Sequence, residues 1–217
     1  MNQDSSNIVV GVLALQGDFA EHIEMLEQCG VSAKPVRYAE ELDHIDGLII
    51  PGGESTAVAK LTDEGSAPIF SAIKEKIGAM PVYGTCMGSI FLAKDIEGSS
   101  QGRLAVMDIK VRRNAFGSQR RSFESDLIID TLGAEAFPAV FIRAPVIVEC
   151  GPKVQVLSAI DEGIVMARQD NLLVTAFHPE ITDDLRVHQY FIDMVKAYRQ
   201  VQSKAVRDSQ VPEPVQV

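Results

Sequence analysis

The sequence predicts an α/β fold with one central sheet, and two patterns carry this prediction. In the first half, short runs of β-branched residues alternate with helical patterns, as in a parallel sheet covered by helices. From about residue 104, several strand-like runs follow one another over loops short enough to favour antiparallel pairing. A chain of 217 residues, 46% hydrophobic and 23% charged, suits a single soluble globular domain.

The first half holds the clearest strand and helix signals. Ile8–Leu15 is apolar on both faces, as expected for a buried parallel strand. Asp18, with Glu21 three residues later, is placed to cap a helix that Gly30 ends. A second strand, Asp46–Pro51, runs into a glycine-rich turn and then a helical stretch.

The remaining elements follow in order along the chain. A helix is expected after Pro68, then a short strand at Met80–Tyr83, and then an apolar helix that begins at Ile90–Ala93. The apolar face of the helix after Pro68 consists of Ile69, Phe70, Ile73 and Ile77. The strands predicted in the second half are Met107–Arg112, Asp126–Ile129, Val140–Ile142, Val154–Leu157, Gly163–Ala167 and Leu172–Phe177.

The end of the chain predicts one long helix and a tail. Asp183–Arg199 is amphipathic, with apolar residues on one face. Beyond it, residues 203–217 contain two prolines and no apolar periodicity. We therefore expect one domain over residues 1–202 and a mobile tail over 203–217.

Charge and cysteine content exclude several classes of function. A net charge of -10 and a pI of about 4.9 leave no basic surface for nucleic acid. Three cysteines, Cys29, Cys86 and Cys150, form neither a disulfide framework nor a zinc site. The N-terminus lacks a basic targeting region, and its first apolar run is too short to span a bilayer. We expect a cytoplasmic protein that binds no membrane and no metal.

Cys86 is the strongest single functional signal. It lies in Gly84-x-Cys86-x-Gly88, after a predicted strand and before a helix, which is the form of a nucleophile elbow with cysteine in place of serine. A cysteine at a helix N-terminus has backbone N–H groups nearby that could hold an oxyanion. The other interpretation of the pentapeptide alone is a small buried cysteine in a tight turn.

His178 and Glu180 could supply the base that a nucleophilic cysteine needs. His178 ends a predicted strand and precedes Pro179, which favours an extended conformation, and Glu180 could orient the imidazole. Because parallel strands end at one edge of a sheet, Cys86 and His178 could meet there. His22, His44 and His188 are expected on the surface or in helix packing. Taken alone, His178-Pro179-Glu180 could equally be a surface turn.

Gly52 and Gly53 follow another predicted strand end. Two consecutive glycines let a peptide N–H turn toward a ligand without steric cost. That arrangement suits a second oxyanion donor, with the Met87 N–H as the first. The alternative is an ordinary turn between a strand and a helix.

Together these residues resemble the class I, or triad, glutamine amidotransferases, and within them the glutaminase subunit of pyridoxal 5'-phosphate synthase. The resemblance runs in family order over six blocks: Gly11–Gly17, Pro51–Thr56, Gly84–Cys86, Arg113–Gly117, Phe141–Pro145 and Phe177–Glu180. It implies a flavodoxin-like three-layer sandwich, with a mixed, mostly parallel sheet, helices on both faces and antiparallel strands in the C-terminal half.

The resemblance also implies a role for each matching residue. Cys86 would be the nucleophile, His178 the general acid and base, and Glu180 the residue that orients His178. The backbone N–H groups of Gly53 and Met87 would form the oxyanion hole. The glutamine pocket would be lined by Gly53, Glu54, Ser55, Arg113, Ile142 and Arg143. Gln16 would lie near the partner subunit. The family has a small residue after the nucleophile, so Met87 is a departure that we expect to tighten the site or change its contact with the partner.

The implied reaction is hydrolysis of L-glutamine to L-glutamate and ammonia through a thioester on Cys86. By the same resemblance, ammonia passes to a (β/α)8-barrel synthase subunit that makes pyridoxal 5'-phosphate, and the chain itself needs no cofactor. A loop that moves into place only in the complex would make the lone chain a poor glutaminase. The alternatives are a cysteine peptidase or γ-glutamyl hydrolase on the same fold, and a catalytically silent regulatory subunit.

Overall fold

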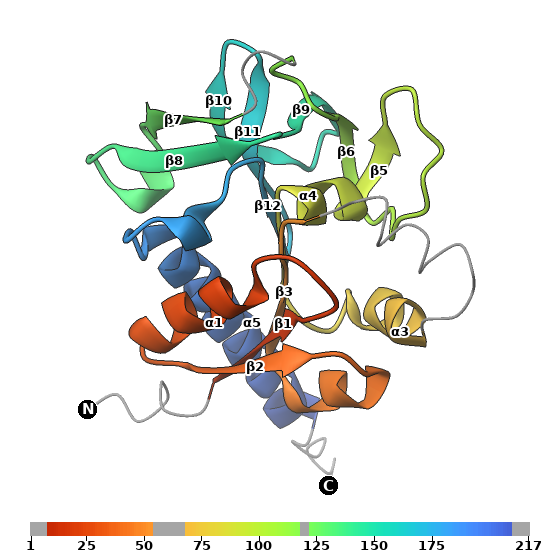
Figure 1. Cartoon of the computed structure of the whole chain (residues 1–217). Coiled ribbons are helices and arrows are strands. Elements are labelled where there is room, and N and C mark those ends of the chain that lie inside the picture. The colour runs from red at the N-terminus through yellow and green to blue at the C-terminus, as the bar shows by residue number, and fades with distance from the viewer. Residues whose placement is uncertain (1–7, 54–67, 118–121, 210–217) are drawn as a thin grey trace, which may run out of the picture.

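A ten-stranded sheet forms the centre of the molecule (Figure 1). The structure is a computed structural model that describes residues 8–53, 68–117 and 122–209. One half of the sheet is parallel throughout, and its strands lie in the order β2 (Ser32–Val36), β1 (Val9–Leu13), β3 (Gly47–Ile50), β4 (Val82–Thr85) and β12 (Leu172–Thr175). The carboxyl ends of these strands therefore meet at one edge.

The other half of the sheet is mostly antiparallel. It continues from β12 through β11 (Gly163–Gln169), β9 (Val146–Cys150), β6 (Met107–Arg112) and β5 (Ala93–Ile96), while β10 (Gln155–Ile160) pairs with β11. Only β5 and β6 run parallel among these pairs of the described chain. A separate hairpin of β7 (Ser122–Leu127) and β8 (Phe137–Ile142) stands beside this half.

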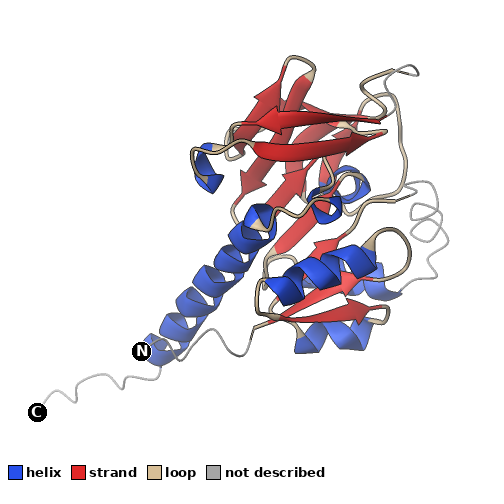
Figure 2. Ribbon diagram, turned by 60° about the vertical axis from the view of Figure 1, so that its left-hand side comes forward, coloured by secondary structure: helices blue, strands red, loops and turns tan. Residues whose placement is uncertain are grey.

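Helices cover both faces of the parallel half (Figures 1 and 2). Helices α1 (Phe19–Gln28) and α5 (Arg186–Ser209) lie on one face, and α3 (Pro68–Lys76) and α4 (Met87–Leu92) on the other. Alternate side chains of β3 face opposite helix layers. Leu48 and Ile50 pack with α3 and α4, whereas Ile49 packs with α1 and α5. Short 3₁₀ turns complete the described elements: η1 (Ala39–His44), η2 (Asp130–Leu132) and η3 (Pro179–Ile181).

The predicted α/β architecture, with its mostly parallel sheet and its antiparallel C-terminal strands, is confirmed. Most predicted elements are present within a few residues of their expected bounds, and Met107–Arg112 matches β6 at both ends. The helical stretch expected after Gly53 lies outside the described residues. Within the described ranges, no helix is both long enough and apolar enough to cross a membrane.

Three strands were not predicted, and several elements have different bounds. Helix α4 begins at Met87 and ends at Leu92, whereas the apolar helix was expected to begin at Ile90–Ala93, and β8 begins at Phe137 rather than Val140. Strands β2, β5 and β9 are additions, and β7 begins at Ser122 rather than Asp126. Helix α5 begins at Arg186 rather than Asp183 and continues to Ser209, past the expected end at Arg199. The predicted tail therefore starts inside this helix, and its residues 210–217 lie outside the described part of the chain.

Candidate active site

Cys86 occupies a sharp turn between β4 and α4. Its φ is 45° and its ψ is -102°, a combination that few residues with a side chain adopt. The flanking glycines are required by close packing. A Cβ on Gly84 would lie 2.6 Å from the Gly88 backbone, and one on Gly88 would lie 2.1 Å from the Ile50 carbonyl oxygen. The turn therefore has the geometry of a nucleophile elbow.

His178 lies at the neighbouring strand end. The Cys86 N–H donates to the Thr175 carbonyl at 2.8 Å, which fixes β12 beside the Cys86 turn. The His178 N–H donates to the Val140 carbonyl at 2.8 Å, and its Nδ1 lies 2.7 Å from Glu180 Oε1. His178 and Glu180 are both buried. The sequence expectation that these side chains share one sheet edge therefore agrees with their positions.

The charge of His178 depends on its two partners. Burial lowers the pKa of the imidazole, but the interactions with Cys86 and Glu180 outweigh burial and raise the pKa of His178 to about 10. Burial raises the pKa of the Glu180 carboxyl, and His178 acts against that shift. At neutral pH the arrangement favours a protonated His178 beside Cys86, with its Nδ1 engaged by Glu180 and its Nε2 without a hydrogen-bond partner among the described residues.

The loop after β3 packs against both His178 and Cys86. The Gly52 N–H donates to Thr85 Oγ1 at 2.9 Å, and a Cβ on Gly52 would lie 2.5 Å from His178 Cε1 and 3.5 Å from Cys86 Cβ. Gly53 has a φ of +138°, which favours glycine, and a Cβ there would lie 2.8 Å from Gln16 Nε2. Gln16 therefore packs directly against Gly53.

Three of the residues expected to bind glutamine, Arg113, Ile142 and Arg143, come from the second half of the chain. The Cys86 Sγ lies 3.9 Å from the Ile142 carbonyl oxygen, and the exposed Arg143 follows with a φ of 44°. The Ala115 N–H donates to the Ala144 carbonyl at 3.1 Å, which brings the loop after β6 beside this turn. Within that loop the half-buried Arg113 donates to Gln101 Oε1 at 2.7 Å. Glu54 and Ser55 lie outside the described residues.

Three further polar residues lie behind His178 and Glu180. Asp18 makes no capping hydrogen bond with its side chain, and its Oδ2 lies 3.5 Å from His178 Nδ1. His22 and His188 are fully buried, so of the two expected positions, surface or helix packing, both residues have the second. The available signal was the spacing of His22 and Leu26, which places both on the inner face of α1.

Asp18, His178 and Glu180 also bring ligand-type atoms within 4.8 Å of one another. His178 Nδ1 and Glu180 Oε1 are already engaged with each other at 2.7 Å. An imidazole whose proton is held by a buried carboxylate is the arrangement of an acid–base pair, and a metal ion would have to break that hydrogen bond.

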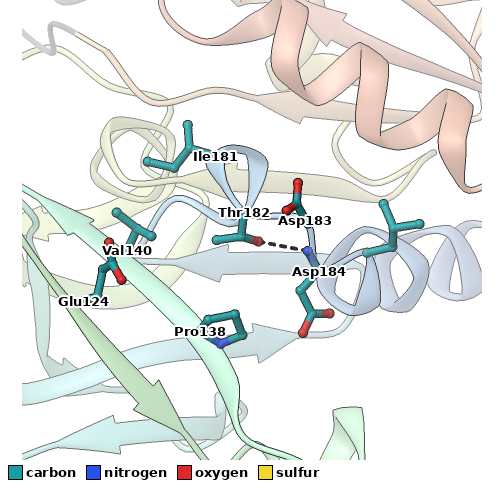
Figure 3. A pocket seen from close by; sticks show the side chains of 8 residues that line it. Glu124, Pro138, Val140, Ile181, Thr182, Asp183 and Asp184 are labelled. Atoms are coloured by element: carbon teal, nitrogen blue, oxygen red, sulfur yellow. Dashed lines mark hydrogen bonds between the residues drawn. The ribbon is translucent and has the colours of Figure 1, made fainter.

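A separate open depression of about 590 Å³ lies next to the loop that carries Glu180 (Figure 3). It is lined by Glu124, Pro138, Val140, Ile181, Thr182, Asp183, Asp184 and Leu185. The Asp184 N–H donates to Thr182 Oγ1 at 3.2 Å, and the Asp184 carboxylate pairs with Arg186. None of the described residues expected to bind glutamine lines this depression, so the candidate active site is the region around Cys86.

Comparison with known proteins identifies close relatives. Residues 12–197 match the SNO glutamine amidotransferase family. The chain is 56% identical over 187 residues to the pyridoxal 5'-phosphate synthase subunit PdxT of Carboxydothermus hydrogenoformans, covering 86% of this chain and 97% of that protein. It is 52% identical over 191 residues to PdxT of Brevibacillus brevis, covering 88% of this chain and 98% of that protein.

Solved structures agree with the fold. A glutamine amidotransferase crystal structure superposes with a TM-score of 0.80 at 46% identity and covers 86% of this chain and 98% of that chain. A putative GMP synthase protein from Thermoplasma acidophilum superposes with a TM-score of 0.67 at 18% identity, covering 90% of this chain and 98% of that one. This second likeness concerns the fold alone.

Proposed function

The chain belongs to the SNO glutamine amidotransferase family, and from this membership we propose that it is the glutaminase subunit of a pyridoxal 5'-phosphate synthase. It hydrolyses L-glutamine to L-glutamate and ammonia, and a synthase subunit takes up the ammonia. The observation that carries the proposal is the buried His178–Glu180 pair at 2.7 Å, placed beside Cys86 on a strained turn.

The proposed chemistry uses Cys86, His178 and Glu180 as a triad. The Cys86 thiolate attacks the amide carbon of glutamine, and the resulting oxyanion is held by the N–H groups of Gly53 and Met87. His178 gives its proton to the departing nitrogen, ammonia leaves, and a thioester remains on Cys86. His178 then takes a proton from water, whose attack releases glutamate and restores the thiolate. Glu180 keeps the imidazole oriented throughout.

The proposed glutamine pocket comprises Gly53, Glu54, Ser55, Arg113, Ile142 and Arg143. A free amino acid presents a carboxylate, which a guanidinium can pair in a bidentate way. The separation of 3.9 Å between Cys86 Sγ and the Ile142 carbonyl oxygen, with Arg143 next in sequence, supports a binding site on this side of the sulfur. Recognition of that carboxylate by a guanidinium favours a free amino acid over a residue inside a peptide, which has no free α-carboxylate.

Gln16 links binding of the partner subunit to the conformation of the oxyanion hole. We place Gln16 at the partner interface, and its side chain packs against Gly53. A (β/α)8-barrel synthase subunit that docks there would act directly on the peptide that supplies one oxyanion donor. Loss of one such donor costs about 10²- to 10³-fold in kcat. The lone chain is therefore a poor glutaminase. The free thiols of Cys29, Cys86 and Cys150 suit a cytoplasmic location.

The test is release of glutamate and ammonia from glutamine, with and without the cognate synthase subunit, beside a Cys86→Ala control. We expect release that depends on both the partner and Cys86. A folded complex that releases neither product would favour a silent regulatory subunit. Rapid turnover by the lone chain would contradict the partner-gated oxyanion hole.

A glutamine-like electrophile provides a second readout in the same samples. It should alkylate Cys86, which lies beside His178, and spare Cys29 and Cys150. Burial raises the pKa of both of those thiols, which leaves them less reactive. Peptide mass analysis locates the label. Equal labelling of all three cysteines would contradict a selective glutamine site at Cys86.

A further inference from the structure

A chain of buried polar side chains continues from Glu180 into the helix layer. His22 Nε2, on α1, lies 3.4 Å from Glu180 Oε2 and 3.3 Å from Thr85 Oγ1. On its other side, His22 Nδ1 lies 2.9 Å from His188 Nε2, on α5. His22, Thr85 and His188 are each 0% exposed. Bulk solvent therefore does not reach these groups, and their hydrogen bonds form inside the protein.

Glu180 needs a second donor. Its Oε1 is taken by His178 Nδ1, whereas its buried Oε2 has no hydrogen-bond partner of good geometry in the described part of the chain. A buried carboxylate oxygen without a donor destabilises the charged form of the acid. His22 Nε2 faces this oxygen, and a small movement of either side chain would complete the hydrogen bond.

The proton positions on the two histidines follow from these contacts. Burial, with repulsion from His188 and His178, holds the pKa of His22 well below its usual value, and burial lowers the pKa of His188 to about 4. Each neutral imidazole therefore carries one N–H. If His188 Nε2–H donates to His22 Nδ1, then His22 Nε2–H points at Glu180 and Thr85. The opposite order would aim a nitrogen lone pair at the carboxylate and bury the His188 Nδ1–H, whose nitrogen has no described partner.

Thr85 connects the same nitrogen to the loop after β3. Its Oγ1 accepts the Gly52 N–H at 2.9 Å and lies 3.3 Å from His22 Nε2. We propose that His22 is a positioning residue, whose Nε2–H holds both the second oxygen of Glu180 and the Thr85 hydroxyl. It thereby couples the acid of the triad to the loop that carries Gly53. This inference rests on the proposed glutaminase function.

The coupling predicts an effect on the pH profile. The titratable groups that face Glu180 are His178 from its own turn, His22 and Asp18 from α1 and its N-terminus, and Tyr83 from β4. Of these, His22 alone approaches Oε2 among the described contacts. Without its N–H the pKa of Glu180 would rise further, so the acid limb of activity would move to higher pH.

Two substitutions distinguish the roles of the two ring nitrogens of His22. His22→Gln can carry an amide N–H to the position of Nε2, whereas His22→Asn reaches only the position of Nδ1. Met25→Leu, at a buried site on the same helix, controls for packing. Each variant is assayed in the complete complex with the synthase subunit, for kcat, KM for glutamine and the pH profile. Thermal unfolding checks that each one folds.

We expect His22→Asn to lower kcat by about 10- to 100-fold with little change in KM, and to move the acid limb upward. His22→Gln should keep the wild-type acid limb and most of the kcat. Equal effects of the two variants, or no effect of His22→Asn, would overturn the proposal. A wild-type complex without Cys86-dependent glutamate release would instead overturn the proposed function.

A spectroscopic measurement on the wild-type chain tests the hydrogen bond whether or not the variants fold. In protein labelled with ¹³C and ¹⁵N, the ring nitrogens report which one carries the proton, and through-bond correlation from the assigned backbone identifies the His22 ring. We expect the Nε2–H form for His22 at neutral pH. The Nδ1–H form would overturn the proposal independently of any activity assay.

Discussion

Cys86 holds a backbone conformation that costs on the order of 1–3 kcal/mol, and its surroundings keep it there. The Thr175 carbonyl accepts its N–H, and the glycines at 84 and 88 allow backbone contacts that a Cβ would prevent. The strain is local, whereas the contacts that offset it come from β12 and β3. The position of the Cys86 sulfur therefore depends on how the ends of these strands pack, and not on residues 84–88 alone.

Gly52→Ala tests how closely the loop after β3 fits His178. The new Cβ would lie 2.5 Å from His178 Cε1, so the imidazole must move from its present position beside Cys86. A displacement of about 1 Å at a catalytic group can cost about 10²-fold, and we expect a loss of that order in kcat. Glutamate release by the complex is the measurement.

Gly78→Ala is the matched control for this substitution. A Cβ at Gly78 meets nothing within 4 Å, and the residue is exposed. This variant should keep wild-type activity, and circular dichroism should show both variants folded. If Gly52→Ala had the same kcat as Gly78→Ala, the loop would accommodate the new methyl group and would not fix the position of the imidazole.

The proposed triad could be predicted from the sequence because each member follows a strand with a strong apolar signal. Parallel strands bring such positions to one edge. Once β4 and β12 are neighbours in the sheet, Cys86, His178 and Glu180 therefore lie close together. The contact between His22 and His188 had no such signal. The two residues are 166 positions apart and meet through the packing of α1 against α5. Helix packing of that kind depends on side-chain shapes that a periodicity does not encode.

At the scale of elements, the missed strands have weak or interrupted patterns. Strand β2 contains Pro35 and three exposed residues, as an edge strand tolerates. Strand β5 follows α4 without a turn and exposes Lys94 and Asp95. Strand β9 did carry a signal in its first three residues, Val146 to Val148. Its pairing is irregular, with a register shift against β6.

Helix α5 extends farther than its apolar face predicts. Residues 201–205 are exposed, so no core position marks this part of the helix in the sequence. Figure 2 shows the last turns running beyond the sheet. Backbone hydrogen bonding continues a helix after packing has ended, and a search for buried positions therefore stops too early.

Phe191→Ala tests the contribution of α5 to stability. Phe191 is 0% exposed, and its ring centroid lies 5.5 Å from that of Tyr83. Removing a buried phenylalanine ring costs about 3–5 kcal/mol in the free energy of unfolding. Chemical denaturation measures the change. Val201→Ala, at a 68% exposed site on the same helix, should stay within about 0.5 kcal/mol of wild type. Similar losses in both variants would contradict the assignment of the packed face.

The packing of α1 against α5 also makes stability depend on pH. Burial lowers the pKa of His188 to about 4, below the ordinary value of 6.5 that the unfolded chain would show. Between these values the unfolded state binds a proton that the folded state does not. Stability from this group is therefore lost as pH falls from about 6.5 to about 4, by on the order of 3 kcal/mol.

Denaturation at pH 7 and pH 5 tests this dependence. His188→Gln should lose less stability between the two pH values than the wild-type chain does. His44→Gln is the control, because His44 is exposed and lies on a different element, η1. If His188→Gln and His44→Gln showed the same pH dependence, His188 would not be the group responsible.

At the scale of the whole molecule, the candidate site lies where the two halves of the fold meet. Cys86 and Gly52 come from the parallel half, whereas Ile142 and Arg143 come from the hairpin beside the antiparallel half. Gln16 follows β1 and contacts Gly53 at the same edge. A partner that binds across this edge therefore reaches the proposed nucleophile, the proposed oxyanion loop and the proposed glutamine pocket together, and one docking event could organise all three.

Gln16→Ala tests whether docking is transmitted through Gly53. We expect saturating synthase subunit to raise kcat of the wild-type chain by at least about 10-fold, and the variant to lose most of that increase. Gln28→Ala, at an exposed position near the other end of α1, should be stimulated as fully as wild type. Titration of the synthase subunit distinguishes two causes of a lost increase. If the variant only binds the partner more weakly, a higher concentration of partner restores kcat. If binding no longer affects Gly53, kcat stays low at saturation. Full stimulation of Gln16→Ala at saturation would mean that the partner acts on the oxyanion loop by another contact, because the side chain that packs against Gly53 would then be dispensable.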